Sequence, residues 1–520
     1  METCDMTLLT RFLALALGSM VAMDAAEASS NEALYDTITD RAERLAGEPY
    51  DDAAPEIPAA LTELDYDQYR QIRFRPEHAI WRDQGLFEVQ LFHPGFLYDR
   101  PVDLNLVNAD GEVHHLPFEA SHFRYDGDVA DLAKLELDDL GYAGFRLHYP
   151  LNSGEYRDEF MVFLGASYFR MVGRGQGYGL STRGLAIDTA EPHGEEFPAF
   201  REFWLVKPEP DATHMTLFAL LDSPSLTGAY RFDIAPGSQT VVDTEARLFA
   251  REDVAKLGVA PLTSMFMHGG IASYPADDYR LRVHDSSGLA LHTGSGERIW
   301  RPLSNPEKLH ISGLQDTSPQ GFGLIQRPRH FDGYLDAEAR YEKRPSEWVT
   351  PLGDWGKGRL ELVEIPSDSE ANDNITAYWV PEQPLKAGQS RTFRYRLRTF
   401  GATPPDQRLA HVIRTRQGWG ATPGQDNPPP ASQRHFIVDF QGPSLEDLDA
   451  DQPVEMRLTT SKGEILEPRV QRLPDGDTWR ANFRLAPEDG TPADMRLALM
   501  LHGEPLTETW NYVWYPNERR

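Results

Sequence analysis

Short strand-like runs separated by turn residues fill most of this chain and constrain its fold more than any other feature. In each run, apolar residues alternate with polar ones or form a brief continuous stretch, and Gly, Pro, Asn or Asp bounds it. This pattern predicts antiparallel strands. The expected strands are 86–92, 142–149, 201–206, 215–221, 228–234, 239–249, 358–365, 375–379 and 390–399. They predict an all-β protein with a large N-terminal β-sandwich that reaches about residue 400.

A second set of evenly spaced runs follows a region rich in Pro and Gly. Residues 401–408, which contain Pro404 and Pro405, are the expected linker, and 418–432 form a further loop. The later strands are expected at 435–440, 454–459, 479–485, 495–501 and 509–514. This spacing predicts a C-terminal immunoglobulin-like β-sandwich over 409–520.

The N-terminus has the pattern of a secretory signal peptide. Arg11 precedes an apolar run over 12–23, which is too short to span a membrane, and Ala26-Glu27-Ala28 fits the small-x-small cleavage pattern. We therefore expect residues 1–28 to be a signal peptide and 29–400 to form the N-terminal domain. That domain would begin with a partly helical lead-in, with helices near 31–46 and 61–72.

Charge and cysteine content narrow the function classes. The formal net charge is −30, which argues against a nucleic acid or an anionic membrane surface as a partner. The single cysteine, Cys4, lies in the expected signal peptide. The mature chain would then have no disulfide, no cysteine metal site and no cysteine nucleophile. These features are typical of a protein exported to a bacterial periplasm.

Motifs for nucleophilic, nucleotide and metal chemistry are missing from the sequence. It contains no G-x-S-x-G elbow, Walker A motif, H-E-x-x-H motif or cysteine-based zinc spacing. The acidic segment 368–373 lacks the glycine of an EF-hand loop. We therefore expect neither a metal nor a cofactor.

The segment 321–379 combines aromatic rings, carboxylates and arginines at high density. A sugar-binding cleft needs this mixture, because flat rings stack on pyranose faces and charged groups bind hydroxyls. Arg329, Trp355 and Trp379 are our candidate substrate-binding residues from this segment. Most glycosidases use two carboxylates, and Asp285 and Asp373 stand out because each lies in a turn beside an expected strand. The residue pattern alone also allows both aspartates to make simple Asx turns, and it favours this alternative over a catalytic role.

Seven motifs follow one another in order along the chain. They are FLGASYFR (163–170), GQGYGLSTRGLAID (175–188), RIWRPL (298–303), GFGLIQR (321–327), YEKRPS (341–346), PLGDWG (351–356) and VEIP (363–366). Together they resemble the osmoregulated periplasmic glucan biosynthesis proteins G and D, over essentially the whole mature chain. Type D proteins usually carry a twin-arginine signal, and its absence here leans towards type G.

This resemblance implies a fold, a compartment and an activity. The fold is a galactose-mutarotase-like N-terminal β-sandwich joined to an immunoglobulin-like domain, and the compartment is the periplasm. The implied activity is an inverting endo-β-1,2-glucanase that needs no cofactor, with Asp373 as general acid and Asp285 as general base. We expect burial to raise the pKa of Asp373 and neighbouring arginines to hold down that of Asp285.

Further residues and partners follow from the same resemblance. Glu370 and Tyr341 match positions that line the family's cleft, and Trp419 matches a loop that can complete it. Two alternatives to hydrolysis remain open: a non-catalytic protein that presents β-1,2-glucan to membrane-bound synthesis machinery, and a transglycosylase that re-links glucan chains. The C-terminal sandwich has no acid pair suited to catalysis, so we expect it to be structural, to form a cleft edge, or to make a homodimer contact.

Overall fold

The computed structural model describes residues 29–52, 57–135, 137, 140–271, 277–405, 407–421, 424–446, 448–449 and 451–518. The expected signal peptide lies outside the described residues. Strands make up 45% of the structure and helices 11%, which confirms the all-β fold class. Every expected strand overlaps an observed one. Within the described part of the chain, each helix is too short or too polar to cross a membrane.

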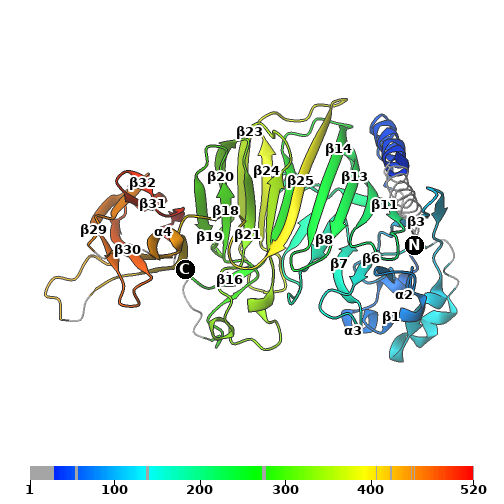
Figure 1. The fold of residues 1–520 in the computed structure, drawn as a ribbon, viewed down its shortest axis with the longest axis horizontal. Coiled ribbons are helices and arrows are strands. Elements are labelled where there is room, and N and C mark those ends of the chain that lie inside the picture. Colours follow the sequence, from blue (N-terminus) through cyan, green and yellow to red (C-terminus); the bar gives the residue numbers. More distant parts are fainter. Residues whose placement is uncertain are drawn as a thin grey trace, which may run out of the picture.

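Two large sheets face each other in the N-terminal β-sandwich (Figure 1). The first has ten strands among the described residues, in the order β2 (Glu88–Phe92), β6 (Gly144–Tyr149), β7 (Asp158–Leu164), β8 (Tyr168–Met171), β9 (Ser181–Arg183), β15 (Leu257–Ser264), β24 (Ile375–Pro381), β23 (Lys357–Glu364) and β20 (His310–Thr317), with β10 (Leu185–Ile187) paired to β15.

The second sheet is longer and extends beyond the first. Its fifteen strands, counted over the same residues, run in the order β28 (Glu455–Thr460), β31 (Ala493–Leu501), β33 (Thr509–Trp514), β19 (Arg298–Pro302), β18 (Gly288–His292), β21 (Gly321–Ile325), β22 (Ser346–Pro351), β25 (Ser390–Phe400), β14 (Val241–Ala250), β13 (Leu226–Ala235), β12 (Met215–Asp222), β11 (Ala199–Val206), β3 (Asp103–Val107) and β4 (Val113–His115), with β32 (Glu504–Pro505) paired to β31.

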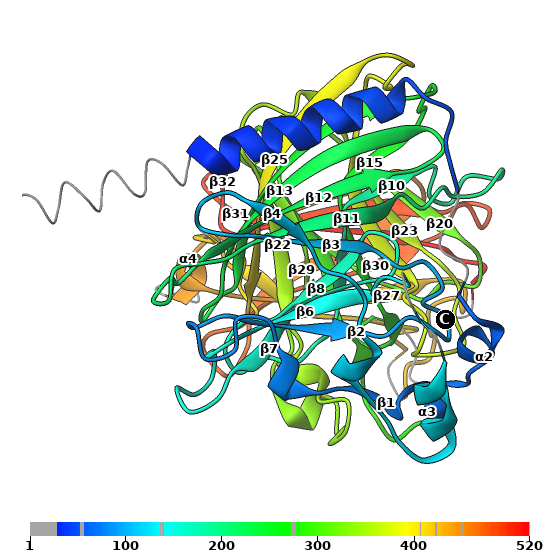
Figure 2. The ribbon, with the colours of Figure 1, turned by 90° about the vertical axis from the view of Figure 1, so that its right-hand side faces the viewer.

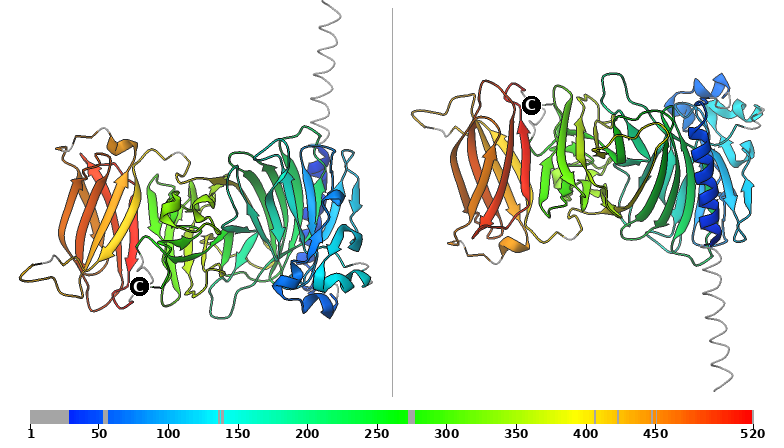
Figure 3. Two further views of the ribbon diagram at one scale, coloured as in Figure 1. Left: turned by 90° about the horizontal axis from the view of Figure 1, so that it is seen from below. Right: turned by 90° about the horizontal axis from the view of Figure 1, so that it is seen from above.

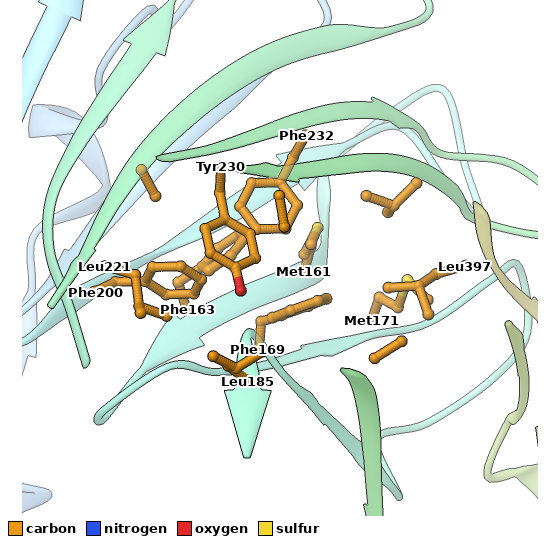
Figure 4. Close-up of a cluster of buried hydrophobic side chains, with 14 of the residues drawn as sticks. Met161, Phe163, Phe169, Met171, Leu185, Phe200, Leu221, Tyr230, Phe232 and Leu397 are labelled. Atoms are coloured by element: carbon orange, nitrogen blue, oxygen red, sulfur yellow. The ribbon is translucent and has the colours of Figure 1, made fainter. Parts of the chain in front are cut away.

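Burial along individual strands follows directly from the side-chain pattern. In β14 every second residue is buried, because successive side chains of the strand point alternately to the core and to the outside. By contrast, all of β15 is buried, because protein covers both faces of this central strand. Aromatic rings fill the space between the sheets: Phe163 of β7 and Phe203 of β11 lie 5.4 Å apart between ring centroids. Figure 4 shows part of this core.

Helical segments cover the edges of the sandwich. A helix over 29–46, close to the expected 31–46, lies across the outer face of the second sheet (Figure 2). Tyr35 anchors it by stacking on Phe218 of β12, at 5.6 Å between ring centroids. The single helix expected at 61–72 is instead two short helices, α2 (Ala59–Thr62) and α3 (Tyr66–Tyr69). Asp65 starts the second one, because its side chain and that of Gln68 form a capping box.

Short elements complete the part of the chain before residue 400. Two of them pair as hairpin strands near the functional residues described below: β16 (Phe266–His268) and β17 (Val283–His284). The others are β1 (Ile72–Phe74), β5 (Phe123–Tyr125) and the 3-10 helices η1 (Pro76–His78), η2 (Ala120–His122), η3 (Gly127–Lys134), η4 (Phe331–Gly333) and η5 (Tyr341–Lys343).

The C-terminal strands form a second sandwich at one end of the elongated molecule (Figure 3). A four-stranded sheet, in the order β26 (His411–Gly418), β27 (Arg434–Gln441), β30 (Trp479–Ala486) and β29 (Glu464–Arg472), packs over β28, β31 and β33. A short helix, α4 (Pro443–Glu446), follows β27. Phe436 and Phe483 of one sheet contact Trp510 of the other, at 6.2 and 6.3 Å between ring centroids.

The two sandwiches share one sheet. Strand β33 pairs in parallel with β19, with Ile299 opposite Thr509 and Trp300 opposite Trp510. The second sheet of the N-terminal sandwich therefore continues into the C-terminal one. Across this junction Arg327, which follows β21, donates hydrogen bonds to both carboxylate oxygens of Glu508.

Candidate functional site

Asp285 lies directly after β17, at the start of the turn into β18. Its backbone N–H donates to the carbonyl of Met265 at 2.8 Å, which holds the turn against the neighbouring strand. The side chain is only 4% exposed, and Arg344 donates from Nη1 to Oδ1. Arg344 in turn lies over the ring of Tyr341, with Cζ 4.3 Å from the ring centroid. The carboxylate of Asp285 is thus buried, paired and fixed in direction.

The pKa of Asp285 reflects this burial. Burial raises the pKa to about 6, Arg344 opposes the rise, and the negative charge of Asp373 adds to it. This result corrects our expectation that neighbouring arginines would hold this pKa down, because removing the carboxylate from water outweighs its ion pair. The effect of Asp373 on this pKa also means that the two candidate carboxylates lie close enough to interact.

Asp373 lies in the loop that leads into β24 and stays in contact with solvent. Its side chain is 31% exposed, and Nη2 of Arg170 on β8 lies 3.6 Å from Oδ2. Burial nevertheless raises its pKa, with Arg170, Arg183 and Arg344 opposing the rise. This direction agrees with our expectation for the residue. Asp373 is therefore a carboxyl group that a substrate can reach and that holds its proton more readily than usual.

Asn374 explains how the two carboxylate loops come together. Its buried side chain accepts a hydrogen bond from the N–H of Phe266 at 2.8 Å and donates to the carbonyl of Phe266 at 3.0 Å. It also donates to the carbonyl of Ile365 at 3.0 Å. Since Phe266 lies in β16, which pairs with β17, one amide side chain links the loop of Asp373 to the hairpin that ends at Asp285.

Glu370 and Tyr341 lie beside this pair and contact each other. The Tyr341 hydroxyl donates to Oε2 of Glu370 at 2.9 Å, and Nη1 of Arg280 donates to the same oxygen at 2.8 Å. Arg280 also pairs with Asp336 at 3.0 Å and Asp278 at 2.9 Å. This guanidinium connects three separate chain segments, and it fixes the direction of the half-exposed Glu370 carboxylate.

Arg329 has a supporting position. Its guanidinium donates to the carbonyls of Glu342, Arg344 and Gly401 and to the Ser346 hydroxyl. Burial lowers its pKa to about 10. Through these hydrogen bonds, the Arg329 side chain holds the backbone on either side of Arg344. Arg329 therefore acts on the site through Arg344.

The three candidate tryptophans differ in exposure. Trp379 is fully buried, and Trp355, only 8% exposed, packs near it against Phe393 and Tyr395. Both rings are packing residues of the sandwich in this structure, which corrects their selection as sugar-stacking residues. Trp419 is 45% exposed in the loop after β26, and its indole N–H donates to the carbonyl of Pro429 at 2.9 Å.

Several residues of the site escaped sequence reasoning. Arg344 and Arg170 were present in the quoted motifs, but nothing in the residue pattern distinguished them from other arginines. Arg280 and Asn374 gave no separate signal, because their roles depend on segments far apart in the chain. Among the described residues, no group of three or more His, Cys, Asp or Glu side chains is arranged to hold a metal ion.

The two carboxyl groups, one partly exposed and one buried, are suited to different proton transfers. A partly exposed carboxyl with a raised pKa can meet a substrate directly, and a buried carboxylate behind it can accept a proton from a water molecule. Arginines beside both groups stabilise negative charge on either one.

Comparison with known proteins identifies the family of this chain. The family described as "Periplasmic glucan biosynthesis protein, MdoG" matches residues 34–514. Among proteins named Glucans biosynthesis protein G, that of Shewanella frigidimarina is 45% identical over 485 residues, covering 92% of this chain and 84% of the relative. The protein of Ralstonia nicotianae is 46% identical over 513 residues, covering 96% of this chain and 99% of the relative. The protein of Rhodopseudomonas palustris is 46% identical over 478 residues, covering 91% of this chain and 92% of the relative. The chain therefore belongs to the MdoG family of periplasmic glucan biosynthesis proteins.

Proposed function

We propose that this protein acts on the β-1,2-glucan backbone as an inverting endo-β-1,2-glucanase of the periplasm. Family membership supports a role in glucan biosynthesis. The observation that carries the catalytic part is the pairing of an exposed carboxyl, Asp373, with a buried one, Asp285: the charge of Asp373 acts on Asp285, and Arg344 acts on both.

Asp373 takes the part of general acid in this proposal. Its side chain reaches solvent, and burial raises its pKa, so it holds a proton more readily than an ordinary aspartate does. It delivers this proton to the leaving glycosidic oxygen, directly or through a substrate hydroxyl.

Asp285 takes the part of general base. At 4% exposure its carboxylate is too deeply buried to bond to a sugar carbon, which argues against a nucleophile and a covalent intermediate. It accepts a proton from the attacking water, directly or along a chain of waters. Use of water in a single displacement inverts the configuration at the anomeric carbon.

Glu370 and Tyr341 are proposed to bind sugar hydroxyls beside Asp373. Because Arg280 and the Tyr341 hydroxyl share one oxygen of Glu370, the carboxylate has a fixed direction before any substrate arrives. Such preorganisation reduces the entropy lost on binding.

The test is the release of reducing ends from linear β-1,2-glucan. The Asp373→Asn variant keeps the shape of the side chain but cannot supply the proton, so we expect turnover to fall by about 10³-fold with the fold intact. Asp368→Asn is the matched control, since Asp368 is an exposed residue of the same loop, and it should retain wild-type turnover. Wild-type turnover by Asp373→Asn would reject the assignment.

The same assay separates the alternatives. If the wild-type protein binds linear β-1,2-glucan but never shortens it, the protein is a glucan-binding component of an assembly. If chain lengths change without a net gain of reducing ends, it is a transglycosylase. Analysis of chain length alongside reducing ends distinguishes these results from hydrolysis.

A further inference from the structure

A small cavity lies at the junction of the two sandwiches, separate from the carboxylate pair. Its walls come from the hairpin of β16 and β17, the end of β19, the segment after β21 and strand β26. Its volume is ≈ 50 Å³. One water molecule occupies about 30 Å³ of liquid, so the cavity has room for one small ion of a few heavy atoms.

The charged residues around this cavity are all cationic. Four arginines line it (Arg282, Arg327, Arg414 and Arg416), and no Asp or Glu is among the described residues of its wall. This concentration of positive charge occurs in a chain whose net charge is −30. Two of the four are already neutralised, because Arg327 pairs with Glu508 at 2.6 Å and Arg414 with Asp439 at 2.8 Å.

The other two arginines have only uncharged partners in the described part of the chain. Arg282 donates to the carbonyl of Gly333 at 3.1 Å. Arg416 donates to the carbonyls of Gly270 at 2.6 Å and Thr415 at 3.0 Å. Burial lowers the pKa of Arg416, and the charges of Arg282 and Arg414 lower it further. The charge of Asp439 opposes this effect on Arg416. Arg282 and Arg416 thus line a shared space, and neither forms an ion pair within the described part of the chain.

Two buried donors line the same cavity. Nε of Arg327 and the hydroxyl of Thr415 are both inaccessible to solvent and have no hydrogen-bond partner among the described residues. The Arg327 side chain is 6% exposed and lies over Trp300, with Cζ 3.4 Å from the ring centroid; Thr415 is 5% exposed. Buried donors in native proteins nearly always have an acceptor, and an acceptor bound in the cavity would complete the hydrogen bonding of these two.

We propose that this cavity binds a small oxyanion, of the size and charge of inorganic phosphate or sulfate. Arg282 and Arg416 supply the charge, and Arg327 Nε and the Thr415 hydroxyl supply directed hydrogen bonds. An oxyanion satisfies both requirements at once, since it is negative and accepts several hydrogen bonds. The anion ties β26 of the C-terminal sandwich to the hairpin that ends at Asp285.

The experiment is a titration of the full chain with phosphate and with sulfate at constant ionic strength, in chloride buffer. We expect one anion per chain by calorimetry, and a melting temperature that rises with phosphate concentration. Arg282→Gln and Arg416→Gln should each weaken binding at least about tenfold. Arg457→Gln, which removes an exposed arginine of the same sandwich, should bind like wild type.

Two further experiments complete the test: one locates the anion in crystals, and the other measures phosphate binding by a catalytic variant. Crystals soaked in selenate should show anomalous scattering inside the cavity. Absence of saturable binding, wild-type affinity in Arg282→Gln/Arg416→Gln, or selenate only at other surface arginines would overturn the proposal. Asp373→Asn should bind phosphate normally, so this site stands or falls independently of the glucanase.

Discussion

Asp285 has a pKa set by two opposing influences, burial and the charge of Arg344. A general base must be ionised, and its pKa lies at about 6. We therefore expect kcat/KM on β-1,2-glucan to fall tenfold per pH unit below this value, as Asp285 takes up a proton. Because Arg344 lowers this pKa, Arg344→Gln should move the acid limb of the pH–rate profile to higher pH.

The control for that shift is Arg340→Gln. Arg340 is close in sequence but pairs with Glu342 at 2.6 Å. Its loss should leave the acid limb in place. An acid limb that is the same in wild type and Arg344→Gln would show that another group controls the low-pH side.

Glu347 on β22 is a second buried acid, outside the proposed mechanism. It is fully buried and accepts a hydrogen bond from the Thr182 hydroxyl at 2.5 Å. Burial raises its pKa from 4.5 to about 8. The folded state therefore holds a proton that the unfolded state loses between pH 4.5 and about 8, so the free energy of unfolding falls as pH rises through this window and levels off above it.

Glu347→Gln should remove this dependence, because glutamine resembles the protonated acid. We expect little change at pH 5 and a free energy of unfolding higher than wild type at pH 9, on the order of 3 kcal/mol. Urea denaturation at both pH values measures it, with the exposed Glu382→Gln as control. A variant less stable than wild type at pH 9 would contradict this explanation.

The sequence predicts which types of residue form the site, but it does not predict what surrounds each of them in the fold. Trp379 and Tyr341 both belong to the aromatic-rich segment, yet one is enclosed between sheets and the other lies beside Asp285 and Glu370. Density of aromatic residues is the same signal for a core and for a sugar site. The carboxylates were chosen by resemblance to a family, since their pairing depends on contacts between residues 88 positions apart (373 − 285).

At the scale of elements, the loop of Asp373 depends on one buried amide. Asn374 makes three hydrogen bonds to the backbone of Phe266 and Ile365. Asn374→Ala leaves those buried groups without partners, so we expect the free energy of unfolding to fall by about 3 kcal/mol. Turnover should also fall, because the two carboxylates are no longer held together.

Asn372→Ala is the matched control. Asn372 is exposed, and its side chain donates only to the Ser367 hydroxyl at 3.3 Å. We expect a change in stability within about 0.5 kcal/mol and wild-type turnover. Equal effects of the two alanine variants, measured by urea denaturation and reducing-end release, would argue against Asn374 as the link.

Strands with clear alternation were predictable, and shorter ones were not. β14 and β25 are long and half-buried, so their period-two pattern is visible in the sequence. β16 and β17 have three and two residues, too few to show any period, yet they place Asp285. Asn374, a residue distant in sequence, holds the backbone of Phe266 in β16.

At the scale of the whole molecule, the junction of the sandwiches contains a buried ion pair. Glu508 is 2% exposed, accepts both Arg327 hydrogen bonds and also accepts from the N–H of Val412 at 2.8 Å. Glu508→Gln leaves the Arg327 charge uncompensated, and we expect a loss of about 3 kcal/mol in the free energy of unfolding.

Calorimetry of the full chain measures this loss. Because the sandwiches share a sheet, wild type should unfold in one transition, and Glu508→Gln should lower the temperature of that transition as a whole. Glu504→Gln, an exposed change on β32, should have no effect. Two separate transitions, with only one displaced by Glu508→Gln, would mean that the sandwiches unfold independently.

The two sandwiches were predictable from the strand pattern, but the sheet they share was not. The parallel pair of Ile299 and Thr509 joins residues 210 positions apart (509 − 299). The spacing of strands along the chain contains no information about such a pair. The expected linker at 401–408 separates the two sandwiches in sequence, whereas the shared sheet connects them in space.

The pairing of β33 with β19 also sets an order of events in folding. β33 ends at Trp514, so the edge of β19 stays unpaired until nearly the whole chain has been made. Contacts this distant in sequence close slowly, and an open strand edge is a template for aggregation. Truncation before Thr509 should therefore leave a product prone to associate through β19.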